Sequence, residues 1–492
     1  MRIFLIIAPL YVFSIICALS CQNTVEYENS VNIPKSVYRP STNNPVDAEN
    51  NNNSSNSNSA ELIMKGALLL EKNRPMQAID CFSDAISKCN NDYLAYYYRG
   101  CAKAILYQYS DAIDDYNLSI NLNCTYVSSW IKRGDSKNLS GDYIGAIIDY
   151  NEALSIDEFN TEALNGRGKA KIYIRDFDGA VEDYNKSLSV DSKNPASWTG
   201  RGISWYNLAN TKQAISDFDS ALSIDAYFID ALQYRAMSKS KEQKYNEAIY
   251  DYSVVINYSP NISDAYIGRG NAYYNIGEYS SSILDYDKAL QLIPNNKYAY
   301  NYRSKARAKL GDYSQALIDV NQAICIDPIY INAWTNRINI KYDMGDLTNA
   351  LLDAENALVI NPESDHSWFL RGFIKFKKGD YSGAISDIEH SVLLTPNDHE
   401  RLILLASLYI DIPDKTLLNY KKGYQLSINA NKLTDFNKSE YLLILAQSCY
   451  FIDDIENAIK YLQKAIDIMP STENEDIRSS YYILLSQYKM NY

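Results

Sequence analysis

A unit of 34 residues repeats ten times, without gap or insertion, from Ser59 to Asp398. A fixed period of 20–50 residues is typical of stacked units and not of a globular domain with one core. The repeat therefore predicts an array in which each unit packs on its neighbours. Positions within a repeat are counted as slots 1 to 34. The ten repeats begin at Ser59, Tyr93, Val127, Thr161, Pro195, Ile229, Ser263, Lys297, Ile331 and Asp365.

Bulky and small residues recur at fixed slots of the repeat. Slot 4 is bulky, slot 8 is small in every repeat but the ninth, which has Ile338, and slot 20 is alanine or serine. Slot 24 is aromatic in repeats 1 to 7. Spacings of three and four residues place slots 4, 8 and 11 on one face of a first helix, and slots 20, 24 and 27 on one face of a second. Glycine at slot 15 suits the turn between them, and proline at slot 32 ends the second helix. Each repeat is therefore predicted to be an antiparallel helical hairpin.

These columns resemble the tetratricopeptide repeat family, whose pattern is W-x2-L-G-x2-Y, then A-x3-F, then P. Trp130 to Gly134, Ala146 to Tyr150 and Pro260 stand at the corresponding places. The resemblance implies an all-α fold, a right-handed superhelical solenoid of antiparallel helix hairpins. It also implies a groove, lined by the first helices, that holds peptides or partner helices. A fold of this kind specifies a mode of contact and not a reaction.

Charged residues at two slots depart from the family pattern. Nine consecutive repeats have arginine at slot 7, where the family has leucine, and aspartate at slot 23. In a hairpin that turns near slot 15, slots 7 and 23 lie at the same height, so we expect nine Arg–Asp pairs within repeats. Pairing between neighbouring repeats would leave Arg99 facing Cys81. We interpret this ladder as a device that fixes the register of each hairpin. The expected pairs are Arg99–Asp115, Arg133–Asp149, Arg167–Asp183, Arg201–Asp217, Arg235–Asp251, Arg269–Asp285, Arg303–Asp319, Arg337–Asp353 and Arg371–Asp387.

The expected groove lining is slots 5, 9 and 12, which point away from slots 4, 8 and 11. Its tyrosines and asparagines suit the recognition of extended peptide. Repeat 10 has three phenylalanines at these slots. They either anchor a partner or become core under the unit that follows. The residues predicted to line the groove are Tyr97, Ile131, Ile203, Tyr206, Tyr274, Tyr342, Phe369, Phe373 and Phe376.

The array is interrupted near the C-terminus. Residues 399–438 are predicted to form an irregular helical unit, either a bend or an insertion, whose second helix starts near Lys415. The spacing returns in residues 439–472, which we interpret as a further repeat. Residues 473–492 are expected to form a capping helix, because the last hydrophobic face of a solenoid must be covered.

The N-terminus has the pattern of a targeting signal. Residues 1–20 carry Arg2 and then an apolar run from Ile3 to Leu19, and Ser20 separates this run from Cys21. This pattern resembles a bacterial lipoprotein signal, in which Cys21 becomes the lipidated first residue. An ordinary secretory cleavage site and an uncleaved anchor are the alternatives. Residues 21–58 are rich in asparagine and serine and are predicted to be a disordered tether.

Composition excludes several classes of function. The formal net charge is −13 and no basic run occurs, which argues against nucleic acid and against direct docking on anionic lipid. Contact with a membrane is expected only through an N-terminal lipid. The eight cysteines form no C-x2-C pair, and the three histidines belong to no recognisable catalytic arrangement. We therefore expect no enzyme activity, no cofactor and no metal.

Two functions remain open from the sequence. The first is a scaffold of the bacterial cell envelope, lipid-anchored, that binds protein or peptide partners in its groove. The second is a glycan- or peptidoglycan-recognising subunit of an envelope enzyme complex. The tryptophans occupy packing slots, where they are not free to stack on sugars, and this favours the scaffold.

Overall fold

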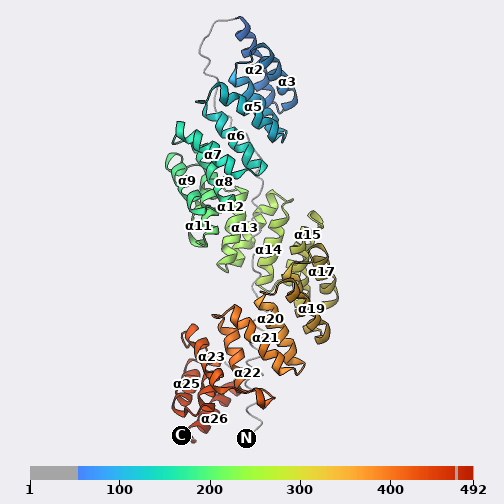
Figure 1. The fold of residues 1–492 in the computed structure, drawn as a ribbon, viewed down its shortest axis with the longest axis vertical. Helices are drawn as coiled ribbons and strands as arrows, with labels where there is room; N and C mark the ends of the chain where they lie inside the picture. The colour runs from blue at the N-terminus through green and yellow to red at the C-terminus, as the bar shows by residue number, and fades with distance from the viewer. Residues whose placement is uncertain (1–53, 471–474, 491–492) are drawn as a thin grey trace. The chain divides into compact units, whose positions relative to one another are not determined.

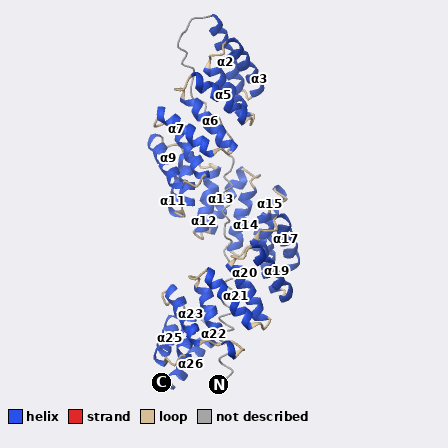
Figure 2. Cartoon of the chain, viewed as in Figure 1, coloured by secondary structure: helices blue, strands red, loops and turns tan. Residues whose placement is uncertain are grey.

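The structure, a computed structural model, describes residues 54–470 and 475–490. Every regular element in this part of the chain is a helix (Figure 2). The described residues divide into two compact bodies. The N-terminal body ends at Ala272, and the C-terminal body begins at Tyr273. None of the described helices has the length and apolarity needed to cross a bilayer. The predicted signal segment, Cys21 and the tether up to residue 53 lie outside the described residues.

Figure 1 shows the helices in chain order, and both bodies are built from consecutive helices joined by short loops. The N-terminal body contains α2 (Ser54–Glu71), α3 (Pro75–Lys88), α4 (Tyr93–Ile105), α5 (Tyr109–Leu122), α6 (Val127–Ser140), α7 (Tyr143–Ile156), α8 (Thr161–Tyr173), α9 (Phe177–Val190), α10 (Pro195–Asn207), α11 (Thr211–Ile224), α12 (Ile229–Lys241), α13 (Tyr245–Tyr258) and most of α14 (Ser263–Asn275). The C-terminal body contains α15 (Tyr279–Leu292), α16 (Lys297–Lys309), α17 (Tyr313–Ile326), α18 (Ile331–Asp343), α19 (Leu347–Ile360), α20 (Asp365–Lys377), α21 (Tyr381–Leu394), α22 (His399–Ile410), the 3₁₀ turn η1 (Lys415–Leu417), α23 (Tyr420–Leu433), α24 (Ser439–Phe451), α25 (Ile455–Ile468) and α26 (Glu475–Met490).

A left-handed turn joins the two helices of each repeat, and side-chain caps begin many of these helices. In repeat 4, the side chain of Asn160 caps α8, and the Asp176 carboxylate accepts a hydrogen bond from the backbone N–H of Gly179 at the start of α9. Such caps satisfy backbone donors that have no partner within the helix. Slot 15, two residues before the start of the second helix, has a positive φ in all ten repeats. Five repeats use glycine there, and the others use Asn73, Tyr107, Arg175, Ala209 and Gln243, with φ from 55° to 65°.

In the core of each hairpin, a small side chain packs against a large one. In repeat 3, a Cβ added to Gly134 would lie 2.9 Å from the ring of Tyr150, so slot 8 must be small where slot 24 is aromatic. Repeat 9 reverses the two sizes, because Ile338 at slot 8 faces Ala354 at slot 24, and both are fully buried. The exceptional isoleucine therefore fills the volume that a ring occupies elsewhere.

Within each body, helices contact the next helix along the chain, such as α6 with α7 and α7 with α8, and several first helices of successive repeats also contact each other. Examples of the second kind are α6 with α8, and α16 with α18. Helix pairs that stack in this way bury their apolar faces between repeats. The first helices of each body therefore share one face, and residues at equal slots form rows along it.

Two boundaries differ from the sequence prediction. Helix α2 begins at Ser54, so residues 54–58 are helical and not part of a disordered tether as predicted. In the irregular unit, the second helix begins at Tyr420 and not near Lys415, because η1 and an extended Leu418 come first. The backbone N–H of Asn419 donates to the carbonyl of Tyr409 at 2.9 Å, which ties this connection to α22.

Candidate functional site

A polar hollow of about 470 Å³ lies on the first-helix face of the C-terminal body. Helices α16, α18 and α20 supply most of its wall, and single residues come from the end of α14 and from α22. Because these are consecutive first helices, the hollow spans several repeats. Its polar lining includes Asn301, Lys305, Lys309, Asn332, Thr335, Asn336, Asn339, Asp343, His366 and Arg401.

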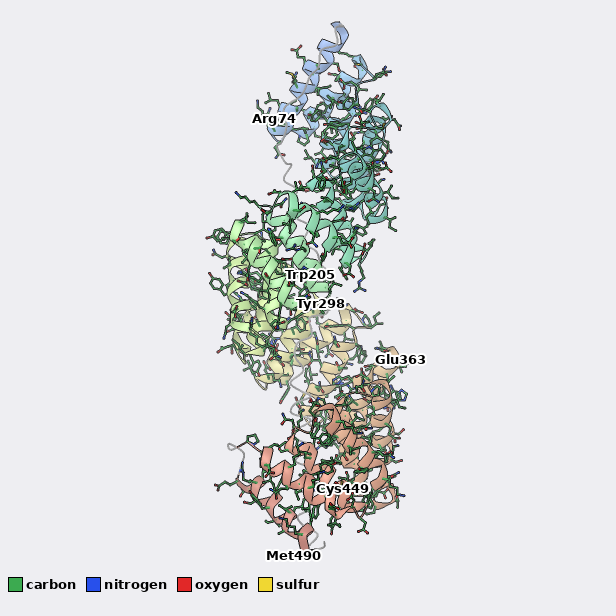
Figure 3. The ribbon with its side chains drawn as sticks, turned by 90° about the vertical axis from the view of Figure 1, so that its left-hand side faces the viewer. Arg74, Trp205, Tyr298, Glu363, Cys449 and Met490 are labelled. Carbon is green, nitrogen blue, oxygen red and sulfur yellow. The ribbon has the colours of Figure 1, made fainter. Side chains whose placement is uncertain are left out.

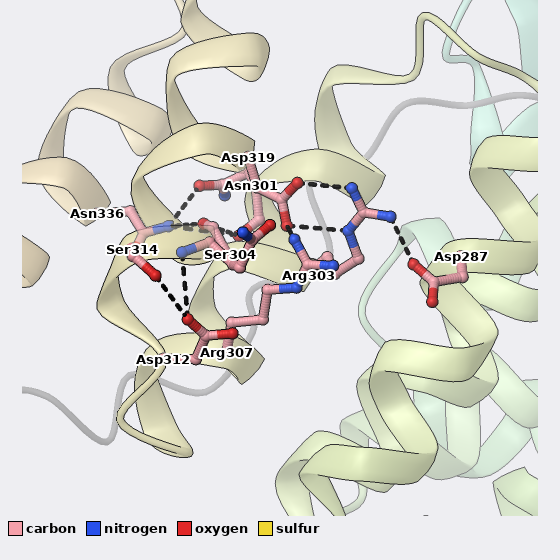
Figure 4. A network of polar contacts seen from close by, with 10 residues as sticks. Asp287, Asn301, Arg303, Ser304, Arg307, Asp312, Ser314, Asp319 and Asn336 are labelled. Carbon is pink, nitrogen blue, oxygen red and sulfur yellow. Dashed lines mark hydrogen bonds and ion pairs between the residues drawn. The ribbon is translucent and has the colours of Figure 1, made fainter.

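Hydrogen bonds between repeats 8 and 9 fix the floor of the hollow (Figure 4). The amide nitrogen of Asn336 donates to the side-chain oxygen of Asn301 at 3.0 Å and also to the hydroxyl of Ser304. Asn301 in turn donates to the Tyr330 hydroxyl at 3.3 Å. Both asparagines are buried. Among the described residues none hydrogen-bonds the amide of Asn339, one turn further along α18, so this group can serve a ligand.

The C-terminal end of the hollow is charged. Arg401 forms ion pairs with Asp365 and, at 3.2 Å, with Asp398. His366 lies beside it, and its pKa falls to about 4, because burial disfavours the imidazolium and the positive charge of Arg401 adds to this effect. The ring is therefore neutral near pH 7 although part of it still reaches solvent.

The expected Arg–Asp contact is present in eight repeats. In repeat 8, Nε and Nη2 of Arg303 donate to the two carboxylate oxygens of Asp319 at 2.9 and 2.6 Å (Figure 4). This is the bidentate geometry that suits a guanidinium. Arg269 and Asp285 belong to different bodies, and their pairing stays a prediction. The observed pairs are Arg99–Asp115, Arg133–Asp149, Arg167–Asp183, Arg201–Asp217, Arg235–Asp251, Arg303–Asp319, Arg337–Asp353 and Arg371–Asp387.

Sequence reasoning missed three further contacts of this ladder, shown by repeat 3. Nη1 of Arg133 donates to Asn117, at slot 25 of the preceding repeat, at 2.7 Å. Lys137, at slot 11, lies 2.8 Å from the second oxygen of Asp149. The guanidinium also lies over the ring of Trp130, 4.7 Å from its centroid, and so covers a face on which a sugar could stack. The ladder therefore joins neighbouring repeats as well as the two helices of one repeat. The contact with the preceding repeat could have been predicted from the sequence, because slot 25 is polar in every repeat.

The predicted groove residues separate into two groups. Tyr97, Tyr274, Tyr342 and Phe376 are partly exposed, and Tyr274 lines the hollow. The other five are at most 7% exposed, so the prediction that they form the groove surface was wrong for this structure. These five apolar side chains turn into the interface with neighbouring helices, and polar residues at slots 2, 5, 9 and 13 line the hollow instead. The five buried residues are Ile131, Ile203, Tyr206, Phe369 and Phe373.

The phenylalanine stripe of repeat 10 belongs to the core. Phe369 and Phe373 cluster with buried residues of α22, including Leu402 and Leu405. The guanidinium of Arg401 lies over Phe369, 5.6 Å from the ring centroid. The irregular unit thus covers the stripe, which was the alternative that the sequence left open.

Metal-binding and redox-active groups were sought among the described residues. No group of three His, Cys, Asp or Glu residues in this part of the chain is placed to hold a metal ion. Six cysteines lie in the described residues, and all are free thiols. Cys449 is fully buried among the last hairpins (Figure 3), where burial raises the pKa of its thiol to about 12.

The geometry therefore defines an all-α repeat protein made of stacked antiparallel hairpins. Sequence models place it more narrowly, because models of the tetratricopeptide repeat match residues 263–296, 365–398 and 439–472. These ranges coincide with repeat 7, repeat 10 and the further repeat after the irregular unit. The protein carries tetratricopeptide repeats, so the family expected from the sequence is confirmed. Proteins with this fold bind protein partners.

Three solved structures show weak similarity to this chain. Yeast Tom70 is 17% identical, with a TM-score of 0.47, over 89% of this chain and 97% of that one. A tetratricopeptide repeat protein from Parabacteroides merdae is 20% identical, with a TM-score of 0.36, over 55% of this chain and 94% of that one. YrrB, described as having an unusual peptide-binding site, is 20% identical, with a TM-score of 0.32, over 37% of this chain and 95% of that one. No curated protein matches the chain. The TM-scores are below 0.5, so the assignment rests on the repeat models and the hairpin geometry.

Proposed function

We propose that the protein is an exported scaffold, lipid-anchored to a bacterial envelope membrane through Cys21, whose first-helix face holds an extended segment of a partner protein. The observation that carries this proposal is the polar hollow of α16, α18 and α20. The hollow places amide and charged side chains in rows along consecutive repeats.

The chemistry of the hollow suits a peptide backbone. Amide side chains both donate and accept hydrogen bonds, and a peptide presents both kinds of group at every residue. Packed helices lie about 8–10 Å apart, and an extended chain rises about 3.3 Å per residue. One repeat therefore meets about three residues of the bound segment. Asn339 is placed to contact it, and the fixed amides of Asn301 and Asn336 keep the floor rigid.

A blocking substitution tests this site. Asn339→Trp should fill the hollow, whereas Gln322→Trp adds the same bulk to an exposed position on the second helix α17. Each variant is expressed in intact cells, crosslinked and purified, and the captured proteins are identified by mass spectrometry. We expect Asn339→Trp to lose partners that Gln322→Trp and the wild type retain. Identical capture by all three proteins would refute a role for the hollow.

Anchoring needs a separate experiment, because Cys21 lies outside the described residues. Mass spectrometry of the mature N-terminus distinguishes the three possibilities. A diacylated or triacylated Cys21 supports the proposal, and Cys21→Ser should then release the protein from membranes. An unmodified cleaved N-terminus indicates secretion, and an intact Met1 indicates an uncleaved anchor. Either of these two results would contradict lipidation.

A further inference from the structure

A second hollow continues the first one along the first-helix face of the C-terminal body. It has a volume of about 390 Å³ and is lined by Tyr342, Asp343, Gly345, Leu347 and Lys377. Asp343, the last residue of α18, lines both hollows. The two hollows therefore border each other at this carboxylate. Together they form one surface, called the joined groove below, that reaches from the end of α14 to the end of α20.

Charged residues of alternating sign mark one edge of the joined groove. Slot 13 is Lys309 in repeat 8, Asp343 in repeat 9 and Lys377 in repeat 10, and all three residues are exposed. Lys305, one helical turn before Lys309, lines the first hollow and adds a second positive charge on α16. Among the described residues, none forms a hydrogen bond or an ion pair with the carboxylate of Asp343. The joined groove therefore presents positive, negative and positive charge on three consecutive first helices.

Aromatic side chains lie at the slot beside these charges. Slot 12 is Tyr274 in repeat 7, Tyr342 in repeat 9 and Phe376 in repeat 10, all partly exposed, whereas repeat 8 has Ala308. Tyr274 lines the first hollow and Tyr342 lines the second. The ring of Tyr274 meets that of Tyr279 edge to face, with 5.3 Å between the centroids, which orients it. Such rings offer flat apolar surfaces that lose little entropy when a ligand packs on them.

The spacing of the charges matches one backbone conformation of a bound segment. Helix α16 contacts α18, and α18 contacts α20, so equal slots recur about every 8–10 Å. A polyproline II helix has three residues per turn and rises about 3.1 Å per residue, so every third side chain returns to one face after about 9.3 Å. A β-strand points successive side chains to opposite faces, so its every third residue would turn away from the protein. The spacing therefore favours polyproline II, which aromatic grooves bind in several recognition domains.

We propose that the joined groove binds a partner segment in the polyproline II conformation that carries acidic, basic and acidic residues at every third position. This inference rests on the proposed function, because it specifies the segment that the first-helix face holds. The acidic residues meet Lys309 and Lys377, and the basic residue meets Asp343. Prolines between them pack on the rings of slot 12 and fix the backbone before binding, which lowers the entropic cost. A segment of uniform charge would place like charges together on at least one of the three helices.

Fluorescence anisotropy with the full-length protein and designed probes tests the inference. The first probe is a fluorescein-labelled peptide of eleven residues, with glutamate at positions 3 and 9, arginine at position 6 and proline elsewhere. The reordered probe has arginine at position 3 and glutamate at positions 6 and 9, so its composition and net charge are the same. A third probe has glutamate at all three positions. A fourth keeps the charges of the first probe but replaces its prolines with glycine and serine.

A charge reversal in the protein is compared with a matched control. Asp343→Lys makes all three charges of slot 13 positive. Glu152→Lys makes the same change of charge at an exposed position on the second helix α7. Because both positions are exposed, both variants should keep the melting temperature of the wild type, which circular dichroism measures. A change in binding then reports on the joined groove and not on loss of the fold.

We expect the wild-type protein to bind the first probe at least about tenfold more tightly than the reordered probe and about fivefold more tightly than the glycine–serine probe. Asp343→Lys should weaken the first probe by at least about tenfold and bind the all-glutamate probe more tightly than the wild type does. Glu152→Lys should keep the order of affinities of the wild type.

Three results would overturn the inference. They are equal affinity of the wild type for the first and the reordered probes, equal affinity for the first and the glycine–serine probes, and no binding of any probe. None of them decides the proposed function, because the capture experiment with Asn339→Trp uses natural partners and no designed charge pattern. Identical capture by Asn339→Trp and the wild type would refute the role of the hollow, and this inference would fall with it.

Discussion

At the scale of single residues, one guanidinium contacts three neighbouring side chains. Arg133 donates to both oxygens of Asp149 and to Asn117, and its flat face rests on Trp130. Removal of one carboxylate therefore leaves a partly buried cation without its anion. Removal of both charges leaves only a packing change, because a buried ion pair contributes little net stability after desolvation.

Repeat 5 gives the cleanest test of this argument, because Trp205 replaces the lysine of slot 11 and Asp217 has a single cationic partner, Arg201. We expect Asp217→Ala to reduce the free energy of unfolding by about 3 kcal/mol. The double variant Arg201→Met/Asp217→Leu should reduce the free energy of unfolding clearly less than Asp217→Ala does. Urea unfolding of the two variants beside the wild type measures the difference. Equal losses in both variants would contradict the interpretation of the ladder as a set of mutually dependent charges.

His366 should make stability depend on pH. Its pKa of about 4 lies below the value of about 6.5 for an unfolded chain, so the unfolded state binds more protons between these pH values. Stability that is present above pH 6.5 is then lost as the pH falls towards 4. The effect is at most about 3 kcal/mol and smaller here, because part of the ring meets solvent. His366→Gln should flatten the difference between unfolding curves at pH 7 and pH 4.5. An unchanged pH dependence would show that the ring is not desolvated.

At the scale of the helix, size is conserved within a hairpin although the residues exchange places. Gly134 faces Tyr150 in repeat 3, and Ile338 faces Ala354 in repeat 9. The side chains at slots 8 and 24 together fill the space between the two backbones, so their summed volume matters more than either residue alone. Ile338 or Ala354 taken alone would depart from the pattern of the other repeats.

This exchange predicts strong coupling between the two slots. Ile338→Gly should cost about 4 kcal/mol through the cavity it leaves, and Ala354→Tyr alone should overpack the same hairpin. The double variant restores the arrangement of repeat 3, so it should be more stable than the sum of the single effects by at least about 2 kcal/mol. A double-mutant cycle in urea measures this energy. Additive effects would mean that the two side chains do not share one space.

The stripe of repeat 10 makes a second prediction at this scale. Phe373→Asp places a carboxylate in a core that α20 and α22 share, so we expect the C-terminal body to unfold or to lose more than about 3 kcal/mol. Ile318→Asp, at a 59% exposed position of α17, should leave stability almost unchanged. Thermal unfolding by circular dichroism compares the two. A normal melting curve for Phe373→Asp would restore the stripe as a partner surface.

Sequence reasoning was strong where spacing alone determines the structure. The hairpins and the Arg–Asp register follow from the distances between slots, which a helix converts directly into faces. It was weak at slots 5, 9 and 12, because these lie at the edge of the helix interface. The type of residue does not decide its direction there, because Ile203 and Asn301 are both buried whereas Asn339 is partly exposed. It also missed the left-handed turns without glycine, such as Ala209, because the neighbouring helices impose that conformation.

At the scale of the whole molecule, the repeats within each body contact mainly their neighbours along the chain, so a surface on the first helices extends by addition of repeats. The two bodies present different chemistry on this face. The N-terminal body has the partly buried carboxylates of Asp230 and Asp264 at slot 2, and the C-terminal body has the amide-lined hollow around Asn339.

Site-specific photocrosslinking in living cells tests the central claim most directly. A photoreactive phenylalanine is placed at Thr335 or Asn339 in the hollow, and at Gln322 or Ile318 on the second helix α17. The account predicts partner adducts at the first two positions and none at the other two. Adducts that form only from α17, or equally from all four positions, would contradict binding on the first-helix face.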